Sequence, residues 1–120
     1  MAEGITAINE KVKKERAFLD ALRLEIDKVL ESLINMETGF RGYMTTGNDA
    51  FLEPYNAGSR QFDTSLAKLQ NLTSDNPGQL ERWSQIDSAQ ARWIEEWIDP
   101  GMAIRTLANQ ATLSESALEA

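Results

Sequence analysis

Residues 37–55, ETGFRGYMTTGNDAFLEPY, contain the first break in a long helical pattern and the start of the segment that follows it. Gly47 suits the left-handed position just after a helix, and Asn48 or Asp49 can cap the N-terminus of the next helix. Pro54 lies within the first turns of that helix, where a missing backbone N–H costs little. The stretch therefore predicts a helical hairpin against which the rest of the chain packs as helices.

Apolar residues precede the hairpin at alternating spacings of three and four. This seam comprises Ile5, Ile8, Val12, Glu15, Leu19, Leu22, Ile26, Val29, Leu33, Met36, Phe40 and Tyr43, of which only Glu15 is polar. A seam of more than five heptads without a proline predicts one helix over about residues 5–46. A second apolar strip comprises Ala17, Ala21, Leu24, Leu30 and Ile34. Two strips suggest two neighbours, the chain's own bundle and a second copy of the chain.

Two further helices are predicted after the hairpin, over about residues 49–72 and 77–98. The apolar face of the first comprises Phe51, Leu52, Tyr55, Phe62, Leu66, Leu69 and Leu72. Residues 73–78, TSDNPG, form the clearest loop in the chain. Asp75 or Asn76 can cap the next helix, with Pro77 just inside it.

The segment around Pro100 allows two interpretations. Asp99, Pro100 and Gly101 form either a turn before a returning fourth helix or a kink from which the third helix continues. The final helix covers about residues 100–118 in both cases. We favour the kink, because one apolar seam continues across the proline at positions 93/94, 97, 101, 104, 108 and 111. The fold class predicted is all-α: an antiparallel up-down bundle of the four-helix type with a very long first helix, forming one domain over residues 1–120.

Composition restricts the possible functions. The net charge of -7 argues against binding to nucleic acid or to an anionic membrane surface, because both need a basic face. The chain has no cysteine and no histidine, which removes thiol chemistry, Ser-His-Asp catalysis and the usual zinc sites. The carboxylates have no spacing typical of a metal-binding loop. We expect no catalytic residues, no metal and no cofactor.

The hairpin also resembles the signature of the CHASE3 family of extracytoplasmic sensory domains. The matching residues are ETGFRGY (37–43), Gly47 and FLEPY (51–55). The similarity continues through LTSDNP (72–77) and a tryptophan-rich helix to about Arg105, and residues after Arg105 match the family pattern poorly.

The resemblance implies a non-catalytic helical bundle, located in the periplasm as part of an inner-membrane protein. Its flanking transmembrane helices would lie outside this sequence. We expect a signal-sensing input domain of a bacterial transmembrane receptor, with a sensor histidine kinase as the parent protein, that relays a small-molecule or protein signal by helix movement. The partner expected is a second copy, forming a parallel homodimer through the long helices. The alternative is a structural or adaptor dimerisation module without a ligand.

Four residues of the hairpin are candidates for ligand binding: Glu37, Arg41, Tyr43 and Tyr55. The spacing of Glu37 and Arg41 favours a structural salt bridge within the helix, with a ligand contact as the alternative. Tyr43 and Tyr55 are expected to pack together at the turn with their hydroxyls at the surface.

Other hairpin and helix residues are assigned to packing. Gly39 and Gly42 each cost roughly 1 kcal/mol inside a helix, which favours close approach of another backbone over the floor of a pocket. Trp83, Trp93 and Trp97 are expected in the core or an interface rather than in an aromatic cage.

Overall fold

The computed structural model describes residues 2–119, with side-chain burial described as far as residue 114, and the described chain is helical apart from its two turns. The elements in chain order are α1 (Ala2–Thr46), the 3₁₀ turn η1 (Asp49–Phe51), α2 (Leu52–Leu72), α3 (Pro77–Trp93), the π turn η2 (Ile94–Ile98) and α4 (Asp99–Glu119). The first helix begins at Ala2 rather than near residue 5. The second predicted helix begins as a 3₁₀ turn.

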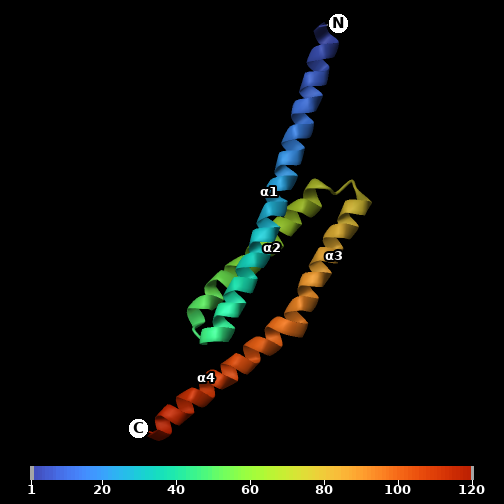
Figure 1. Cartoon of the computed structure of the whole chain (residues 1–120). Coiled ribbons are helices and arrows are strands. Elements are labelled where there is room, and N and C mark those ends of the chain that lie inside the picture. Colours follow the sequence, from blue (N-terminus) through green and yellow to red (C-terminus); the bar gives the residue numbers. More distant parts are fainter. Residues whose placement is uncertain (1, 120) are drawn as a thin grey trace.

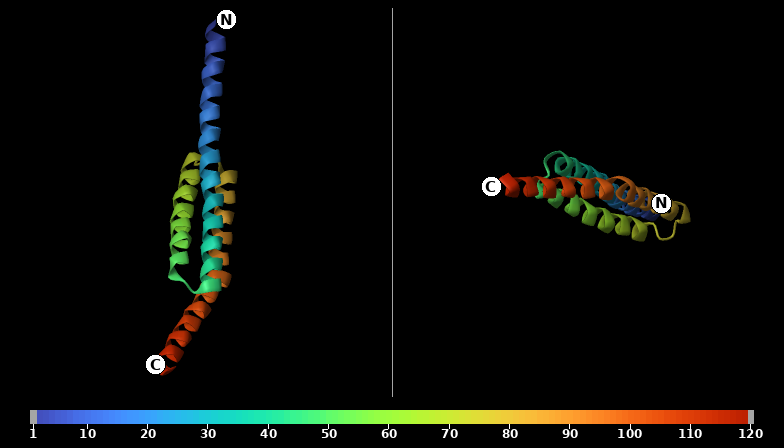
Figure 2. Two further views of the ribbon diagram at one scale, coloured as in Figure 1. Left: turned by 60° about the vertical axis from the view of Figure 1, so that its left-hand side comes forward. Right: turned by 90° about the horizontal axis from the view of Figure 1, so that it is seen from below.

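The helices form an elongated antiparallel arrangement. α2 runs back along the C-terminal half of α1, and α3 runs antiparallel to α2, as Figure 1 shows. α4 continues from α3 past the hairpin, so the two ends of the described chain lie at opposite ends of the molecule (Figures 1 and 2). The principal extents are 88 × 24 × 15 Å. The all-α class and the antiparallel packing are confirmed.

The main hydrophobic core lies where α1, α2 and α3 run side by side. It comprises Val29, Phe62, Leu66, Leu69 and Trp83, with Leu22, Leu33, Leu80 and Ile86 packed around it. The predicted seam of α1 is therefore buried only in its C-terminal half. Ile5, Ile8, Val12 and Leu19 are exposed, because α2 and α3 do not extend along that part of α1.

Small residues allow α1 and α2 to approach closely. A Cβ atom added at Gly58 would lie 2.8 Å from the carbonyl oxygen of Ser32. One added at Gly39 would lie 2.6 Å from the carbonyl oxygen of Phe51 and 2.9 Å from the backbone nitrogen of Tyr55. Ser65 of α2 is also buried. The prediction that Gly39 serves close backbone approach is confirmed.

Asparagine side chains cap the two helical segments that begin after the turns. Asn48 accepts a hydrogen bond from the Ala50 N–H at 2.9 Å, and Asn76 accepts one from the Gln79 N–H at 3.2 Å. Pro77 occupies the first turn of α3. Of the paired alternatives in the sequence, Asn48 and Asn76 are therefore the side chains that cap.

Pro100 lies in a kinked continuation of the helix, and the chain does not turn there. The π turn η2 precedes it, and the Asp99 N–H bonds to the carbonyl of Ile94, five residues back. Proline lacks the N–H of a regular helix and its ring clashes with the carbonyl four residues earlier, which favours such a bulge.

The apolar positions that were predicted to face inward on both sides of Pro100 are partly wrong. Of the predicted positions, 101 is half-buried, but 97, 104, 108 and 111 are exposed. Ile98 is buried, and positions 102, 105 and 109 are half-buried. The π turn contains one extra residue, and this shifts the inward-facing positions of α4 by about one residue.

Candidate functional site

The end of α1 is held by side chains from α4. Gly47 adopts a left-handed φ of 68°, and its N–H bonds to the Tyr43 carbonyl at 2.7 Å. Asn109 of α4 donates a hydrogen bond to the Gly47 carbonyl at 3.0 Å. The Arg105 guanidinium lies against Gly47, where its charge complements the negative end of the α1 dipole. The tip of the hairpin is thus bound to α4.

Tyr43 makes a second contact between α1 and α4. Its ring is buried, and its hydroxyl forms a hydrogen bond of 2.9 Å with the Thr106 hydroxyl. The expectation that this hydroxyl is at the surface is therefore wrong. Sequence alone did not indicate Thr106, because the contact depends on α4 continuing past the hairpin.

Tyr55 lies on the α2 side of the tip and is half-buried. Burial raises the pKa of its hydroxyl above the ordinary value of 10, and the negative charge of Asp99 raises it further. The two candidate tyrosines therefore have different environments: Tyr43 contacts Thr106, whereas Tyr55 is influenced by the first residue of α4.

The pKa of Tyr55 predicts a pH dependence of stability. A pKa raised in the folded state means that the unfolded state loses the tyrosine proton first as the pH rises. The stability contributed by neutral Tyr55 is fully present below about pH 10 and is lost as the pH rises through the folded-state pKa. Urea unfolding at pH 9 and pH 11 measures this loss, and Tyr55→Phe is expected to reduce it. An identical loss in both proteins would contradict the prediction.

Glu37 and Arg41 line a groove between α1 and the α3–α4 junction. We call it the distal groove. It is lined by Leu33, Glu37, Phe40, Arg41, Trp93 and Trp97, and its volume is about 440 Å³. Glu37 Oε1 and Arg41 Nη1 are 3.7 Å apart, and their side chains are 58% and 76% exposed. Trp97 is 68% exposed. The structure thus brings two of the four candidate residues together and places Tyr43 and Tyr55 outside the groove lining.

The π turn lies next to the tryptophans of the distal groove. Trp93 is the last residue of α3, directly before the π turn, and Trp97 lies within that turn. π-bulges inside α-helices occur frequently at functional sites. The sequence contained one signal for this feature, Pro100, which was interpreted as a kink without a bulge.

Comparison with known families agrees with this architecture. The CHASE3 domain model matches residues 12–119, nearly the whole chain. The chain belongs to the CHASE3 domain family. CHASE3 domains are extracytoplasmic sensory input domains of bacterial receptors. Searches of curated proteins and of solved structures found no significant match.

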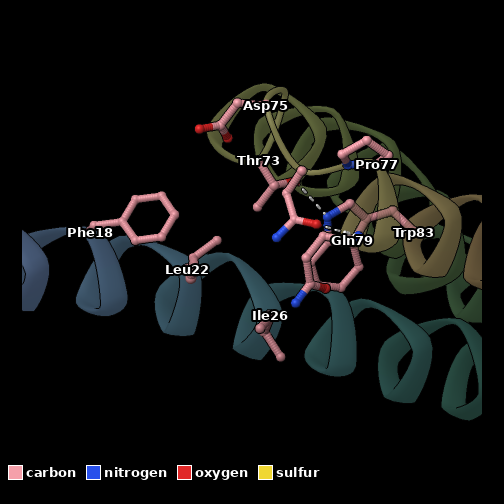
Figure 3. Close-up of a pocket in the computed structure, with 9 residues that line it drawn as sticks. Phe18, Leu22, Ile26, Thr73, Asp75, Pro77, Gln79 and Trp83 are labelled. Carbon is pink, nitrogen blue, oxygen red and sulfur yellow. Dashed lines mark hydrogen bonds between the residues drawn. The ribbon is translucent and has the colours of Figure 1, made fainter.

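This CHASE3 domain has a second pocket at the opposite end of its bundle, beside the α2–α3 loop. The pocket has a volume of about 420 Å³ and is lined by Phe18, Leu22, Ile26, Thr73, Asp75, Asn76, Pro77, Gln79 and Trp83. In Figure 3, Phe18 and Leu22 lie on the side of α1 that faces the loop. The Trp83 indole N–H donates to the Thr73 hydroxyl at 2.9 Å. Sequence reasoning assigned Trp83 to the core and did not detect a pocket beside it.

The three tryptophans of this CHASE3 domain do not line a common site. Trp83 belongs to the core and to the loop pocket, whereas Trp93 and Trp97 line the distal groove. Within residues 2–119, no group of three or more acidic side chains could hold a metal ion. No helix in that range is both long enough and apolar enough to cross a bilayer.

An exposed apolar stripe follows α1 through most of its length. It comprises Ile5, Ile8, Val12, Leu19, Ile26, Leu30 and Ile34. At 100° per residue these positions lie within about 80° of one another around the helix. The stripe combines part of the predicted seam with part of the second strip. Arg16 and Arg23 fall on the same face between these apolar positions. A row of large exposed apolar side chains along one helix face is typical of an interaction face.

Proposed function

We propose that this domain is the sensory input of a bacterial transmembrane receptor and relays its signal by helix movement. The observation that carries the proposal is the connection between α1 and α4 at the tip. Tyr43, Gly47, Thr106 and Asn109 join the end of a 45-residue helix to a helix that leaves the bundle. A sensor histidine kinase is the parent protein we propose.

The length and continuity of α1 support this role. A helix of 45 residues is about 67 Å long, and its first turns extend well beyond the α2–α3 loop. Because no glycine or proline lies between Gly4 and Gly39, the helix can transmit a displacement as a rod. A signal that favours one of two packings at the tip would change the position or rotation of the opposite end.

The energy available for this relay is limited. A ligand shifts the equilibrium only by its differential affinity for the two packings, typically about 1–3 kcal/mol. The contacts at the tip are of suitable strength, since net contributions of single hydrogen bonds are about 0.5–1.5 kcal/mol. A few such contacts could therefore be exchanged by one binding event.

Insertions in α1 test helix movement in the full-length receptor. One to four alanines inserted after Arg16 leave the packed core untouched, and each rotates the preceding part of the helix by about 100°. We expect the autophosphorylation of the receptor to vary periodically with the number of inserted residues. Output that is the same for all four insertions would contradict the proposal.

We propose that the receptor is a parallel homodimer in which the α1 stripes face each other. Seven large apolar side chains on one face of one helix are costly to leave in water. Their spacings of three, four and seven residues suit helix-to-helix packing. A nucleic acid or a lipid headgroup would not cover this apolar stripe, and the negative charge of the domain disfavours both.

Cysteine crosslinking tests the dimer in membranes, because the chain has no native cysteine. Leu19→Cys lies in the stripe, whereas the exposed Ala17→Cys lies about 160° away around α1. We expect oxidative crosslinking at least tenfold faster for Leu19→Cys than for Ala17→Cys. Equal rates would contradict the assigned face.

The alternative function is a structural dimerisation module without a ligand, which the stripe alone would also support. The sequence flanking residues 1–120 distinguishes the two. Apolar segments on both sides, followed by a signalling domain, would support the receptor. In either case we propose a non-catalytic domain, because a chain without histidine or cysteine lacks the usual nucleophile and base pairs.

A further inference from the structure

The distal groove combines apolar walls with one positive and one negative side chain. Leu33, Phe40, Trp93 and Trp97 supply the walls, and Glu37 and Arg41 supply the charges. Its volume of about 440 Å³ lies within the range of about 300–1,000 Å³ typical of small-molecule sites. A few polar groups among apolar walls fix the orientation of a ligand in such sites.

The two charges are available to a ligand. Their closest atoms are 3.7 Å apart, and more than half of each side chain is exposed. An exposed pair of this kind is weak, because water competes for both partners. A ligand that carries both charges can replace the pair with two shorter contacts. Its carboxylate would pair with the planar guanidinium of Arg41, and its ammonium group would pair with Glu37.

The indole rings favour the same chemistry. A cation close to the face of a tryptophan gains electrostatic attraction, and Trp93 and Trp97 line the same groove as Glu37. The remaining walls are apolar and would contact the uncharged body of the ligand. Glu37 would repel a purely anionic ligand, and Arg41 would repel a purely cationic one.

We propose that the distal groove binds a zwitterionic α-amino acid with an apolar or aromatic side chain. The inference rests on the proposed sensory function, for which it supplies the class of ligand. The ligand would contact α1 through Glu37 and Arg41 and the π turn through Trp97. Binding would therefore bias the relative position of α1 and α4.

Calorimetric titration of the full chain tests the proposal with defined probes. L-phenylalanine, L-leucine, L-methionine and L-valine are titrated first, and saturable binding of at least one with a Kd below about 1 mM is expected. For the amino acid that binds best, the N-acetyl derivative lacks the ammonium charge and the amide derivative lacks the carboxylate. Each derivative is expected to bind at least tenfold more weakly.

Matched variants assign the binding to the groove. Glu37→Gln, Arg41→Gln and Trp97→Ala are each expected to weaken binding at least tenfold. Glu53 and Arg60 form a control pair, because their atoms are also 3.7 Å apart and their side chains are also exposed, yet neither lines the groove. Glu53→Gln and Arg60→Gln are expected to leave binding unchanged. Circular dichroism of each variant establishes that it remains folded.

Three results would overturn the proposal: no binding of any of the four amino acids, equal binding of the charge-blocked derivatives, or equal losses in the control variants. These results concern binding to the purified domain. The alanine insertions in α1 test signal relay in the intact receptor, so the two proposals fail independently.

Discussion

Replacing Phe62 by alanine is expected to lower the free energy of unfolding by about 3–5 kcal/mol. The ring is completely buried in the core between α1, α2 and α3, where Val29, Leu66, Leu69 and Trp83 belong to the same cluster. The substitution removes the transfer free energy of the ring and leaves a cavity that rigid helices fill only partly. Because total stabilities are about 5–15 kcal/mol, this loss is a large fraction of the whole.

Urea unfolding followed by circular dichroism measures the effect, and Phe18→Ala is the matched control. Phe18→Ala removes the same ring, but Phe18 is 43% exposed on α1. We therefore expect the free energy of unfolding to fall by less than about 1 kcal/mol. Similar losses for the two variants would show that the core is not where the structure places it.

Replacing Gly39 by alanine is expected to destabilise the protein by about 1–3 kcal/mol, against the intrinsic preference for alanine in helices. The added methyl group would lie 2.6 Å from the Phe51 carbonyl oxygen and 2.9 Å from the Tyr55 nitrogen. Both atoms belong to the backbone, which cannot rotate away as a flexible side chain can. α1 and α2 would have to separate near the hairpin, with loss of packing around the tip.

Gly4→Ala provides the comparison for this prediction. Gly4 lies in the same helix with nothing within 4 Å of an added Cβ atom, so only the helix preference acts there. We expect no loss, and a gain of up to about 1 kcal/mol. Thermal unfolding of both variants is the measurement. A Gly39→Ala variant that is as stable as Gly4→Ala would contradict the close approach seen at the hairpin.

Local signals in the sequence predicted the helices and their turns well. Gly47 marked the end of α1, because the left-handed conformation favours glycine. Each helix start was narrowed to two neighbouring residues, of which Asn48 and Asn76 accept the hydrogen bond from a free N–H group. The face of α2 that contains Phe62, Leu66 and Leu69 was also predicted. Each of these features depends on residues within a few positions of one another.

Features that depend on distant segments were predicted less well. The heptad seam gave no indication that its N-terminal half would be exposed, because that outcome depends on how far α2 and α3 extend. The extra residue of the π turn shifted the inward positions of α4, and a fixed helical period cannot anticipate such a shift. The Tyr43–Thr106 contact depends on the path of α4 after that turn, and the groove beside Glu37 and Arg41 depends on where α3 meets α1.

α4 extends beyond the residues that hold it to α1, so a change of angle at the kink before Pro100 would move its far end most. α4 has 21 residues and is therefore about 30 Å long. A change of about 10° at the kink would displace the far end of α4 by about 5 Å, which is about one full turn of a helix. Thr106 lies seven residues, or about 10 Å, from the start of α4, so the same change of angle would shift its contact with Tyr43 by about 2 Å.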